Sequence, residues 1–356
     1  MFLNELNQLE LWGADVGNAY LEAETQEKIF IIGGPEFKER VGHILIIRKA
    51  LYGLRSSGQM WHRRFAQCMK DLGFERCYAD MDVWMRPSPQ GDCYEYVAVW
   101  VDDLMISMKN PKGYCDTLKK KFSFKLKGDG PISYHLGLNY IRDKDGTLRC
   151  QPSDYIDKMK ETFMAIFKEL PKKWKTPLKK GDHPEVDDSP LLNEEQILHY
   201  LTLIGQIQWL VTLGRIDVFS ACVTMSKFRH MPRQGHIQRL KRIYGYVWHT
   251  KQGAIRVRTH EPDLSEYPDQ AFDWAHTIYG NVTETLPDNA PKPLGKEVVL
   301  TVYVDANLYH DLVSGRALTA VLHFINQTPF DWYSKKQGTV EDATFASEFN
   351  AAKTLQ

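Results

Sequence analysis

Two apolar runs separated by a pair of aspartates constrain the fold of this chain more than any other feature. Tyr94–Val101 and Leu104–Ser107 are rich in aliphatic and aromatic residues, and only Asp102 and Asp103 lie between them. Apolar runs with so short a polar link predict two strands of a tight hairpin. This hairpin would carry two carboxylates at its tip. Aspartate is also common in turns that have no chemical role, so the pair alone does not identify a site.

The segments around this hairpin predict a mixed domain. Apolar side chains at helical spacing predict a helix over Gln59–Leu72, with Ser56 or Ser57 as its N-cap and Gly73 at its end. The other predicted elements are strands at Leu9–Val16, Ile29–Ile32 and His43–Ile47 and a helix at Lys112–Phe122. A strand-helix-strand-strand-helix order is typical of a split β-α-β sheet with helices on one face.

A third carboxylate lies near the end of the first predicted strand. Asp15 is the penultimate residue of the apolar run Leu9–Val16. If this strand is a neighbour of the hairpin, three carboxylates converge at one end of the sheet. They would repel one another unless cations neutralise them, and their oxygens suit Mg²⁺. Two such ions are the machinery of in-line phosphoryl transfer.

The remainder of the chain predicts a helical region, an irregular segment and a second sheet. The pattern from Tyr155 to Tyr246 is mostly helical, and five prolines between residues 261 and 296 indicate a linker. Beyond it we expect strands at Val298–Val304, Ala317–Phe324 and Phe330–Tyr333 and a helix at Glu341–Leu355. The predicted parts are therefore 1–150, 151–260, 261–296 and 297–356.

Positive charge is concentrated in the helical region, although the whole chain has 45 basic and 45 acidic residues. This balance excludes a globally basic nucleic-acid-coating protein, but not local basic patches. Residues 218–260 contain nine Lys and Arg and no Asp or Glu, and a second basic run surrounds Trp174. Solvated faces usually mix both signs, so this pattern favours a polyanionic partner over an ordinary solvated helix face.

Other classes of protein lack support in the sequence. The longest apolar runs are too short to span a bilayer, and no secretory signal is visible at the start. The six cysteines are widely spaced without a Cys-x-x-Cys pair, which predicts free thiols rather than a zinc site. Patterns typical of serine hydrolases, zinc proteases and phosphate loops are absent.

Several motifs together resemble reverse transcriptases of copia-type LTR retrotransposons. They occur in the family's order at Asp15–Leu21, Lys49–Arg55, Gly73-Phe74, Val101–Asp103, Tyr134–Leu138 (similar to the primer-grip hairpin) and Tyr200–Gly205. The sequence departs from the family at Ser56-Ser57-Gly58, where many members have Gln-Ala-Pro, and at Trp100, where Tyr is commoner. The resemblance implies an α+β fold: a polymerase palm (split β-α-β, ferredoxin-like), a helical thumb/connection and a truncated ribonuclease H-like fold.

The resemblance also implies roles for individual residues. Asp15, Asp102 and Asp103 would be the catalytic triad that binds two Mg²⁺, or Mn²⁺ in their place. Tyr20 would lie under the incoming sugar and leave no room for a 2′-hydroxyl, with an ordinary core aromatic as the alternative. The other nucleotide-binding groups would be the Val16 carbonyl, Tyr52 and Gly53. The basic residues that would hold the nucleic-acid backbone are Lys172, Lys173, Lys175, Lys227, Arg229, Arg233, Arg239, Lys241 and Arg242.

The C-terminal segment resembles the start of a ribonuclease H domain at Tyr303–Ala306, Asp331–Gln337 and Ser347–Phe349. This resemblance implies catalytic roles for Asp305, expected at a strand end, and Glu348, expected at the edge of a buried helix face marked by Phe345 and Phe349. Only 14 residues precede Asp15, and the chain ends at Gln356. We therefore expect a fragment of a polyprotein or a decayed genomic copy, with most of the fingers region missing and without autonomous ribonuclease H activity.

The leading hypothesis is an RNA-directed DNA polymerase fragment that transfers nucleotides from a dNTP to a primer 3′-hydroxyl. Its implied partners are an RNA template, a DNA primer, their hybrid and other parts of the parent polyprotein, without a membrane. The implied location is intracellular, in a cytoplasmic retrotransposon particle or the nucleus. The alternatives are an inactive nucleic-acid-binding remnant and a different palm-like nucleotidyl transferase or cyclase.

Overall fold

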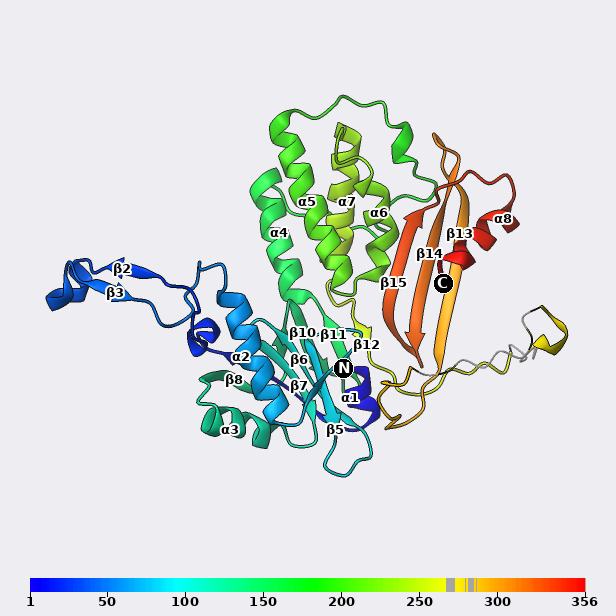
Figure 1. Cartoon of the computed structure of the whole chain (residues 1–356). Coiled ribbons are helices and arrows are strands. Elements are labelled where there is room, and N and C mark those ends of the chain that lie inside the picture. The colour runs from blue at the N-terminus through cyan, green and yellow to red at the C-terminus, as the bar shows by residue number, and fades with distance from the viewer. Residues whose placement is uncertain (267–272, 279, 281–284, 286, 356) are drawn as a thin grey trace. The chain divides into compact units, whose positions relative to one another are not determined.

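In a computed structural model of the chain, the predicted hairpin lies inside an antiparallel sheet of six strands (Figure 1). The structure describes residues 1–266, 273–278, 280, 285 and 287–355. The chain divides into two compact units, one formed by residues 3–132 with 263–297 and the other by residues 133–262 with 298–356.

The sheet of the first unit has the strand order β4-β5-β6-β7-β1-β8, and all neighbouring strands are antiparallel. Strand β1 is thus inserted between β7 and β8, as predicted for a split β-α-β sheet. The strands are β1 (Glu10–Val16), β4 (Glu75–Arg76), β5 (Val83–Pro87), β6 (Tyr94–Trp100), β7 (Asp103–Met108) and β8 (Leu126–Pro131). The helices are α1 (Phe2–Leu6), which precedes β1, α2 (Ser57–Asp71) and α3 (Pro111–Lys121).

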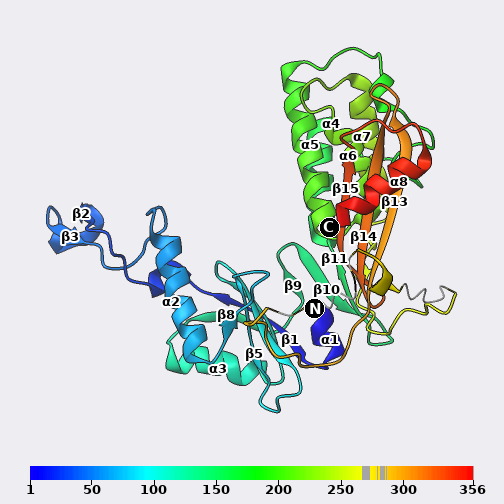
Figure 2. The same ribbon diagram turned by 45° about the vertical axis from the view of Figure 1, so that its right-hand side comes forward.

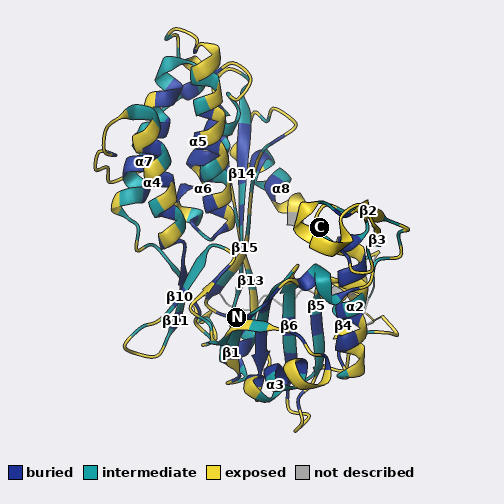
Figure 3. Cartoon of the chain, turned by 90° about the vertical axis from the view of Figure 1, so that its left-hand side faces the viewer, coloured by how far each residue is buried: buried dark blue, intermediate teal, exposed yellow. Residues whose placement is uncertain are grey.

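Helices α2 and α3 cover the same face of this sheet. Trp61 and Phe65 of α2, Leu118 of α3 and Ile106 of β7 belong to one buried apolar cluster. Figure 3 shows buried residues alternating with exposed ones along the helices, as the predicted apolar periodicity requires. The burial of this common face holds the sheet and both helices together.

The expected serine cap of α2 does not form. Ser56 is at the N-cap position, but its hydroxyl donates to Glu27 and accepts no hydrogen bond from the N–H groups of the helix start. The hydroxyl of Ser57 donates to the Leu51 carbonyl at 2.6 Å. Both hydroxyls therefore donate to acceptors in the preceding loop, and neither accepts a hydrogen bond from the N–H groups of the helix start. The helix does end before Gly73, whose φ of +77° favours glycine.

Strands β2 (Phe30–Ile32) and β3 (Ile44–Ile46) pair as a separate ribbon. They correspond to the two short strands that the sequence predicts. The side chains of Phe30, Ile32, Ile44 and Ile46 are exposed, and the ribbon projects away from the rest of its unit (Figure 2). Two-stranded ribbons are marginally stable when nothing covers them.

The second unit combines a helical bundle with two small sheets. Its helices are α4 (Ser153–Phe167), α5 (Glu194–Thr212), α6 (Phe219–Ser226), α7 (Gln234–His249) and α8 (Thr344–Ala352). One sheet has the order β12-β11-β10-β9 and the other β13-β14-β15. These strands are β9 (Tyr134–His135), β10 (Leu138–Arg142), β11 (Leu148–Gln151), β12 (Ile255–Arg256), β13 (Leu300–Asp311), β14 (Arg316–Ile325) and β15 (Thr328–Lys336). Helices α4, α5, α6 and α7 share a buried core.

The two units do not follow the four predicted parts. The boundary between them falls at residues 132 and 133, because β9, β10 and β11 pair into one sheet with β12 from residues 255–256. The predicted linker 261–296 has no α-helix or β-strand in its described residues, while 267–272, 279, 281–284 and 286, including Pro268, lie outside them. No helix in the described part of the chain is long and apolar enough to cross a membrane.

Candidate active site

The register of β1 and β7 brings the predicted acids to one end of the sheet. Asp15 pairs directly with Asp103 in this antiparallel ladder. The amide of Val16 donates to the Asp102 carbonyl at 2.8 Å, which fixes the hairpin turn against β1. Side chains of directly paired antiparallel residues lie on the same face of a sheet and close together. The structure therefore brings Asp15 and the Asp102–Asp103 turn together, although their segments are distant in sequence.

Negative charge at this end of the sheet is not neutralised by an ion pair within the protein. Partial burial, then the charges of Asp102 and Asp15, raises the pKa of Asp103. Lys127 faces Asp15 on β8, but no ion pair to any of the three acids occurs among the described residues. Its side chain instead packs over Gly17. The Cε atom of Lys127 is 3.1 Å from the position that a Cβ atom added at Gly17 would take.

The donor set fits a hard divalent cation, because three carboxylates without a protein counter-ion provide oxygen ligands and unbalanced charge. Within the described ranges, however, no three His, Cys, Asp or Glu side chains already converge as a metal cluster. The assignment of Asp15, Asp102 and Asp103 as metal ligands therefore stays a prediction.

The two predicted nucleotide-binding tyrosines lie beside the acids. The ring centroids of Tyr20 and Tyr52 are 4.6 Å apart. Loss of water contact, followed by the charge of Asp102 and the proximity of Tyr20 and Asp15, raises the pKa of Tyr52. The structure thus places the Tyr52 ring, which packs against Tyr20, in the electrostatic field of Asp102 and Asp15. Tyr20 is partly buried against α2, whereas Tyr52 is exposed.

The remaining two predicted nucleotide-binding residues have clear backbone roles. Val16 is fully buried and links β1 to the hairpin turn through its amide. Gly53 has a φ of +97°, and a Cβ there would meet no atom within 4 Å. Glycine is therefore required at this position by backbone conformation, while the space beside it is open.

Several of the predicted nucleic-acid-binding cations are used inside the protein. Arg239 of α7 donates to Asp182 at 2.8–3.1 Å and to Asp187 at 2.6 Å. Lys241 pairs with Glu169 at 2.8 Å. Arg242 donates to Thr176 and lies over the Trp174 ring, and Arg233 donates to the Ser189 carbonyl. These contacts tie the loop before α5 to helix α7.

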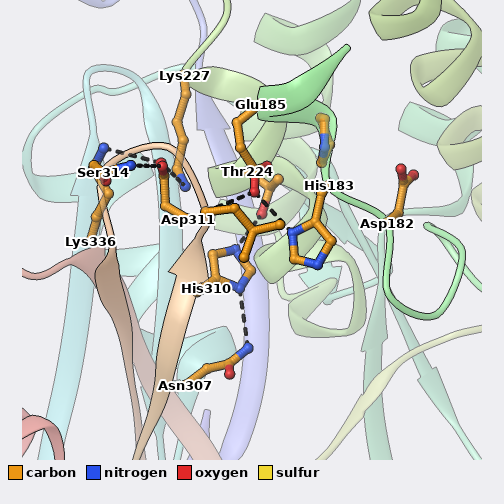
Figure 4. A network of polar contacts seen from close by, with 12 residues as sticks. Asp182, His183, Glu185, Thr224, Lys227, Asn307, His310, Asp311, Ser314 and Lys336 are labelled. Atoms are coloured by element: carbon orange, nitrogen blue, oxygen red, sulfur yellow. Dashed lines mark hydrogen bonds and ion pairs between the residues drawn. The ribbon is translucent and has the colours of Figure 1, made fainter. Parts of the chain in front are cut away.

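Lys227 belongs to a further network, shown in Figure 4. Its ammonium lies 3.4 Å from the buried carboxylate of Asp311, which Lys336 also contacts at 3.2 Å. Burial would raise the pKa of Asp311, but hydrogen bonds from Ser314 and the two lysines hold it well below its usual range. Nothing in the sequence singled out Asp311, because its partners are 84 and 25 residues away.

Four of the nine predicted cations are both exposed and without an ion pair among the residues that the structure describes: Lys172, Lys173, Lys175 and Arg229. The guanidinium of Arg229 donates to the Ser226 carbonyl at 3.2 Å and keeps its charge available to solvent. These residues remain the candidates for phosphate contacts.

The acids of the C-terminal segment occupy different surroundings from those expected. Asp305 is not at a strand end, since β13 continues to Asp311. Phe345 and Phe349 are 81% and 54% exposed, so they do not mark the buried face of α8. That face consists of small residues, with Ser347 and Ala351 fully buried against the sheet. Glu348 follows Ser347 and is half-buried, so its place at the edge of the buried face is as expected.

Comparisons with known proteins show which proteins this chain is similar to. Residues 6–170 match the family model of reverse transcriptase (RNA-dependent DNA polymerase). The chain is 25% identical over 350 residues to the putative transposon Ty5-1 protein of Saccharomyces cerevisiae, covering 96% of this chain and 99% of that protein. It is 26% identical over 347 residues to the retrovirus-related Pol polyprotein from transposon RE1 of Arabidopsis thaliana. It is 24% identical over 356 residues to the corresponding polyprotein from transposon TNT 1-94 of Nicotiana tabacum.

The coverage of these relatives is uneven. The alignments include 96% and 97% of this chain but only 20% and 24% of the RE1 and TNT 1-94 polyproteins. The chain therefore spans about a quarter or less of these two relatives and nearly the whole of the Ty5-1 protein. Residues 6–170 belong to the reverse transcriptase family, and nearly the whole chain is homologous to Pol polyproteins of Ty/copia-type retrotransposons.

Proposed function

We propose that this chain catalyses RNA-directed DNA synthesis, by nucleotidyl transfer from a dNTP to the 3′-hydroxyl of a primer. One observation carries the proposal: the strand pairing that sets Asp15 against Asp103, with the Tyr52 ring, packed against Tyr20, in the electrostatic field of Asp15 and Asp102. The family of residues 6–170 supports the same class of activity.

Each residue of the site has a chemical role in this proposal. Asp15, Asp102 and Asp103 would hold divalent cations, with the Val16 carbonyl as a further oxygen ligand. Mg²⁺, when bound, would favour the ionised 3′-hydroxyl and offset charge on the transferred phosphate. Tyr20 would exclude a ribose 2′-hydroxyl, and Tyr52 with Gly53 would border the nucleotide. The exposed Tyr52 ring supports this, because a face open to solvent is free to receive a ligand.

The nucleic-acid backbone would bind to the exposed cations of the second unit. Lys172, Lys173, Lys175 and Arg229 have no internal ion pair among the described residues, which supports their contact with phosphates. Such contacts position a template–primer duplex without reading its sequence. The RNA template, the DNA primer and the remaining parts of a parent polyprotein are the proposed partners.

The C-terminal sheet and α8 are proposed as the beginning of a ribonuclease H domain. Helix α8 packs against β13, which carries Asp305, and Glu348 lies next to the buried face of that helix. In the described part of the chain these two acids join no group of three or more metal donors. The prediction that the purified chain does not cleave an RNA–DNA hybrid is tested directly, and cleavage abolished by Asp305→Asn would contradict it.

Primer extension on an RNA template with Mg²⁺ and dNTPs tests the main proposal. Asp102→Asn should abolish incorporation while hybrid binding stays within about twofold, because the substitution removes a metal ligand and not a phosphate contact. Asp71→Asn is the matched control, since it removes the same charge from the exposed end of α2. Equal incorporation by the Asp102 variant and wild type would refute the proposal. Hybrid binding without incorporation by wild type would favour the alternative of a nucleic-acid-binding remnant.

A further inference from the structure

We propose that Trp61 is a positioning residue of this site, which holds the turn that carries Asp102 and Asp103 in its working conformation. The proposal deepens the proposed function and depends on it for its catalytic consequence. Trp61 is on α2, 40 residues before the carbonyl that it contacts. No metal ligand or nucleotide contact is assigned to it.

The turn between β6 and β7 needs an external support. Only Val101 and Asp102 separate these strands. Val101 has a φ of +58°, whereas no positive φ is found at Asp102. A positive φ at the first central residue alone corresponds to a type II′ turn, which favours glycine at that position. A β-branched residue there is strained, and such strain persists only where the surroundings impose it.

The side chain of Val101 does not provide that support. It is 47% exposed, so the burial of its own methyl groups cannot fix the backbone. The carbonyl of Val101, by contrast, accepts a hydrogen bond of 2.5 Å from the indole Nε1–H of Trp61. Trp61 is 2% exposed, and its ring packs 5.5 Å from the rings of both Phe65 and Phe124. The donor is therefore rigid.

The next peptide unit is held by a different element. The carbonyl of Asp102 accepts from the Val16 amide of β1 at 2.8 Å. Two consecutive carbonyls of the turn are thus fixed by two different elements, helix α2 and strand β1. Together they determine where the carboxylates of Asp102 and Asp103 leave the backbone. Removal of the indole donor leaves only the β1 contact, so the strained turn can relax and displace both acids.

A double-mutant cycle separates positioning from simple packing. Trp61→Phe removes the N–H donor and keeps an aromatic ring in the core. We expect at least a tenfold fall in kcat for primer extension, with KM for the dNTP changed less than threefold. Val101→Gly removes the strain, because glycine adopts a positive φ readily. In that background Trp61→Phe should reduce kcat less than threefold.

Trp84→Phe is the matched control for the loss of an indole. Trp84 is also 2% exposed and belongs to the same core, and no hydrogen bond from its indole occurs among the described residues. We expect its effect on kcat to be the same in the wild-type background and in the Val101→Gly background, whatever its size. A Trp61→Phe loss that persists unchanged in the Val101→Gly background, or the absence of any loss, would overturn the proposal.

Two measurements on the metal-free protein keep this test independent of polymerase activity. In the wild type and in Val101→Gly alike, the Trp61 indole proton should exchange with solvent at least tenfold more slowly than that of the exposed Trp100, because glycine keeps the turn, and with it the acceptor carbonyl, in place. The drop in thermal midpoint caused by Trp61→Phe should be larger in the Val101→Gly background than in wild type, because only in wild type does relaxation of the strained turn offset part of the lost hydrogen bond. If wild type extends no primer but both results are found, the proposed function fails and the support of the turn by Trp61 stands. If neither result is found, the proposed support of the turn by Trp61 is refuted, whether or not the protein extends a primer.

Discussion

Substitution of Arg239 by glutamine distinguishes a structural cation from one that binds nucleic acid. Arg239 belongs to the basic segment that the sequence associates with a polyanion, but its guanidinium contacts Asp182 and Asp187 with four hydrogen bonds. The side chains are 20%, 11% and 10% exposed, respectively. Arg239→Gln would leave two largely buried carboxylates without their cation.

The expected loss of stability follows from that burial. Breaking a buried ion pair by the removal of one partner costs about 3–5 kcal/mol. Asp187 keeps its hydrogen bonds from Ser189, so we expect the lower end, about 3 kcal/mol. For a unit of roughly 150–250 residues this corresponds to a fall in Tm of about 6–12 °C. Thermal unfolding followed by circular dichroism measures it.

Binding of an RNA–DNA hybrid should respond differently. The slope of log Kd against log salt concentration, measured by fluorescence anisotropy, should not change in Arg239→Gln. The control Lys173→Gln removes an exposed cation without an ion pair, and it should lower that slope by about one with Tm unaltered. A reduced slope at unchanged Tm for Arg239→Gln would refute the structural assignment.

Three further predictions concern the other parts of the molecule. Asp311→Asn should lower the Tm at neutral pH; the pKa of Asp311 is depressed in the folded state, so its contribution is present above the ordinary aspartate pKa and is lost as the pH falls, and the two melting curves should converge in acid. A constant difference down to the lowest pH would contradict this. Tyr20→Val should increase ribonucleotide incorporation relative to dNTP by about tenfold or more, measured as the ratio of kcat/KM values, and an unchanged ratio would remove the proposed sugar gate. Ile207→Ala should cost about 2–5 kcal/mol in chemical denaturation, because Ile207 is fully buried in the helical core, and a loss under about 1 kcal/mol would indicate a core that closes around the cavity.

Local patterns were sufficient to predict the three strands that carry the candidate site, but not β4, β5 and β8 of the same sheet. The apolar run Leu9–Val16 and the hairpin around Asp102 correspond to β1, β6 and β7, because short buried strands leave a strong signal in the sequence. The insertion of β1 beside β7 also agrees with the split β-α-β prediction. Asp15 lies near the end of β1, and Asp103 is the first residue of β7. Because β1 and β7 are antiparallel neighbours, the two acids come to the same end of the sheet.

The support of that site could not be predicted from local patterns. Trp61 has the spacing of an ordinary core residue of α2, and nothing in the sequence distinguishes its indole nitrogen from that of Trp84. The hydrogen bond to Val101 depends on how α2 lies over the hairpin, which is set by tertiary packing. The unusual backbone of Val101 is likewise invisible, because its residue type argues for a plain strand.

The use of the basic residues depends on tertiary structure for the same reason. Between residues 218 and 260 the sequence contains no acid, and this absence suggests a face free to bind phosphates. The fold supplies the missing acids from elsewhere: Asp182 lies 57 residues before Arg239, and Asp311 lies 84 residues after Lys227. A run of positively charged residues in the sequence is therefore compatible with a neutral surface in the folded protein. Phosphate binding should be assigned instead to cations that are exposed and make no ion pair, and in the helical region Lys172, Lys173, Lys175 and Arg229 meet that condition among the described residues.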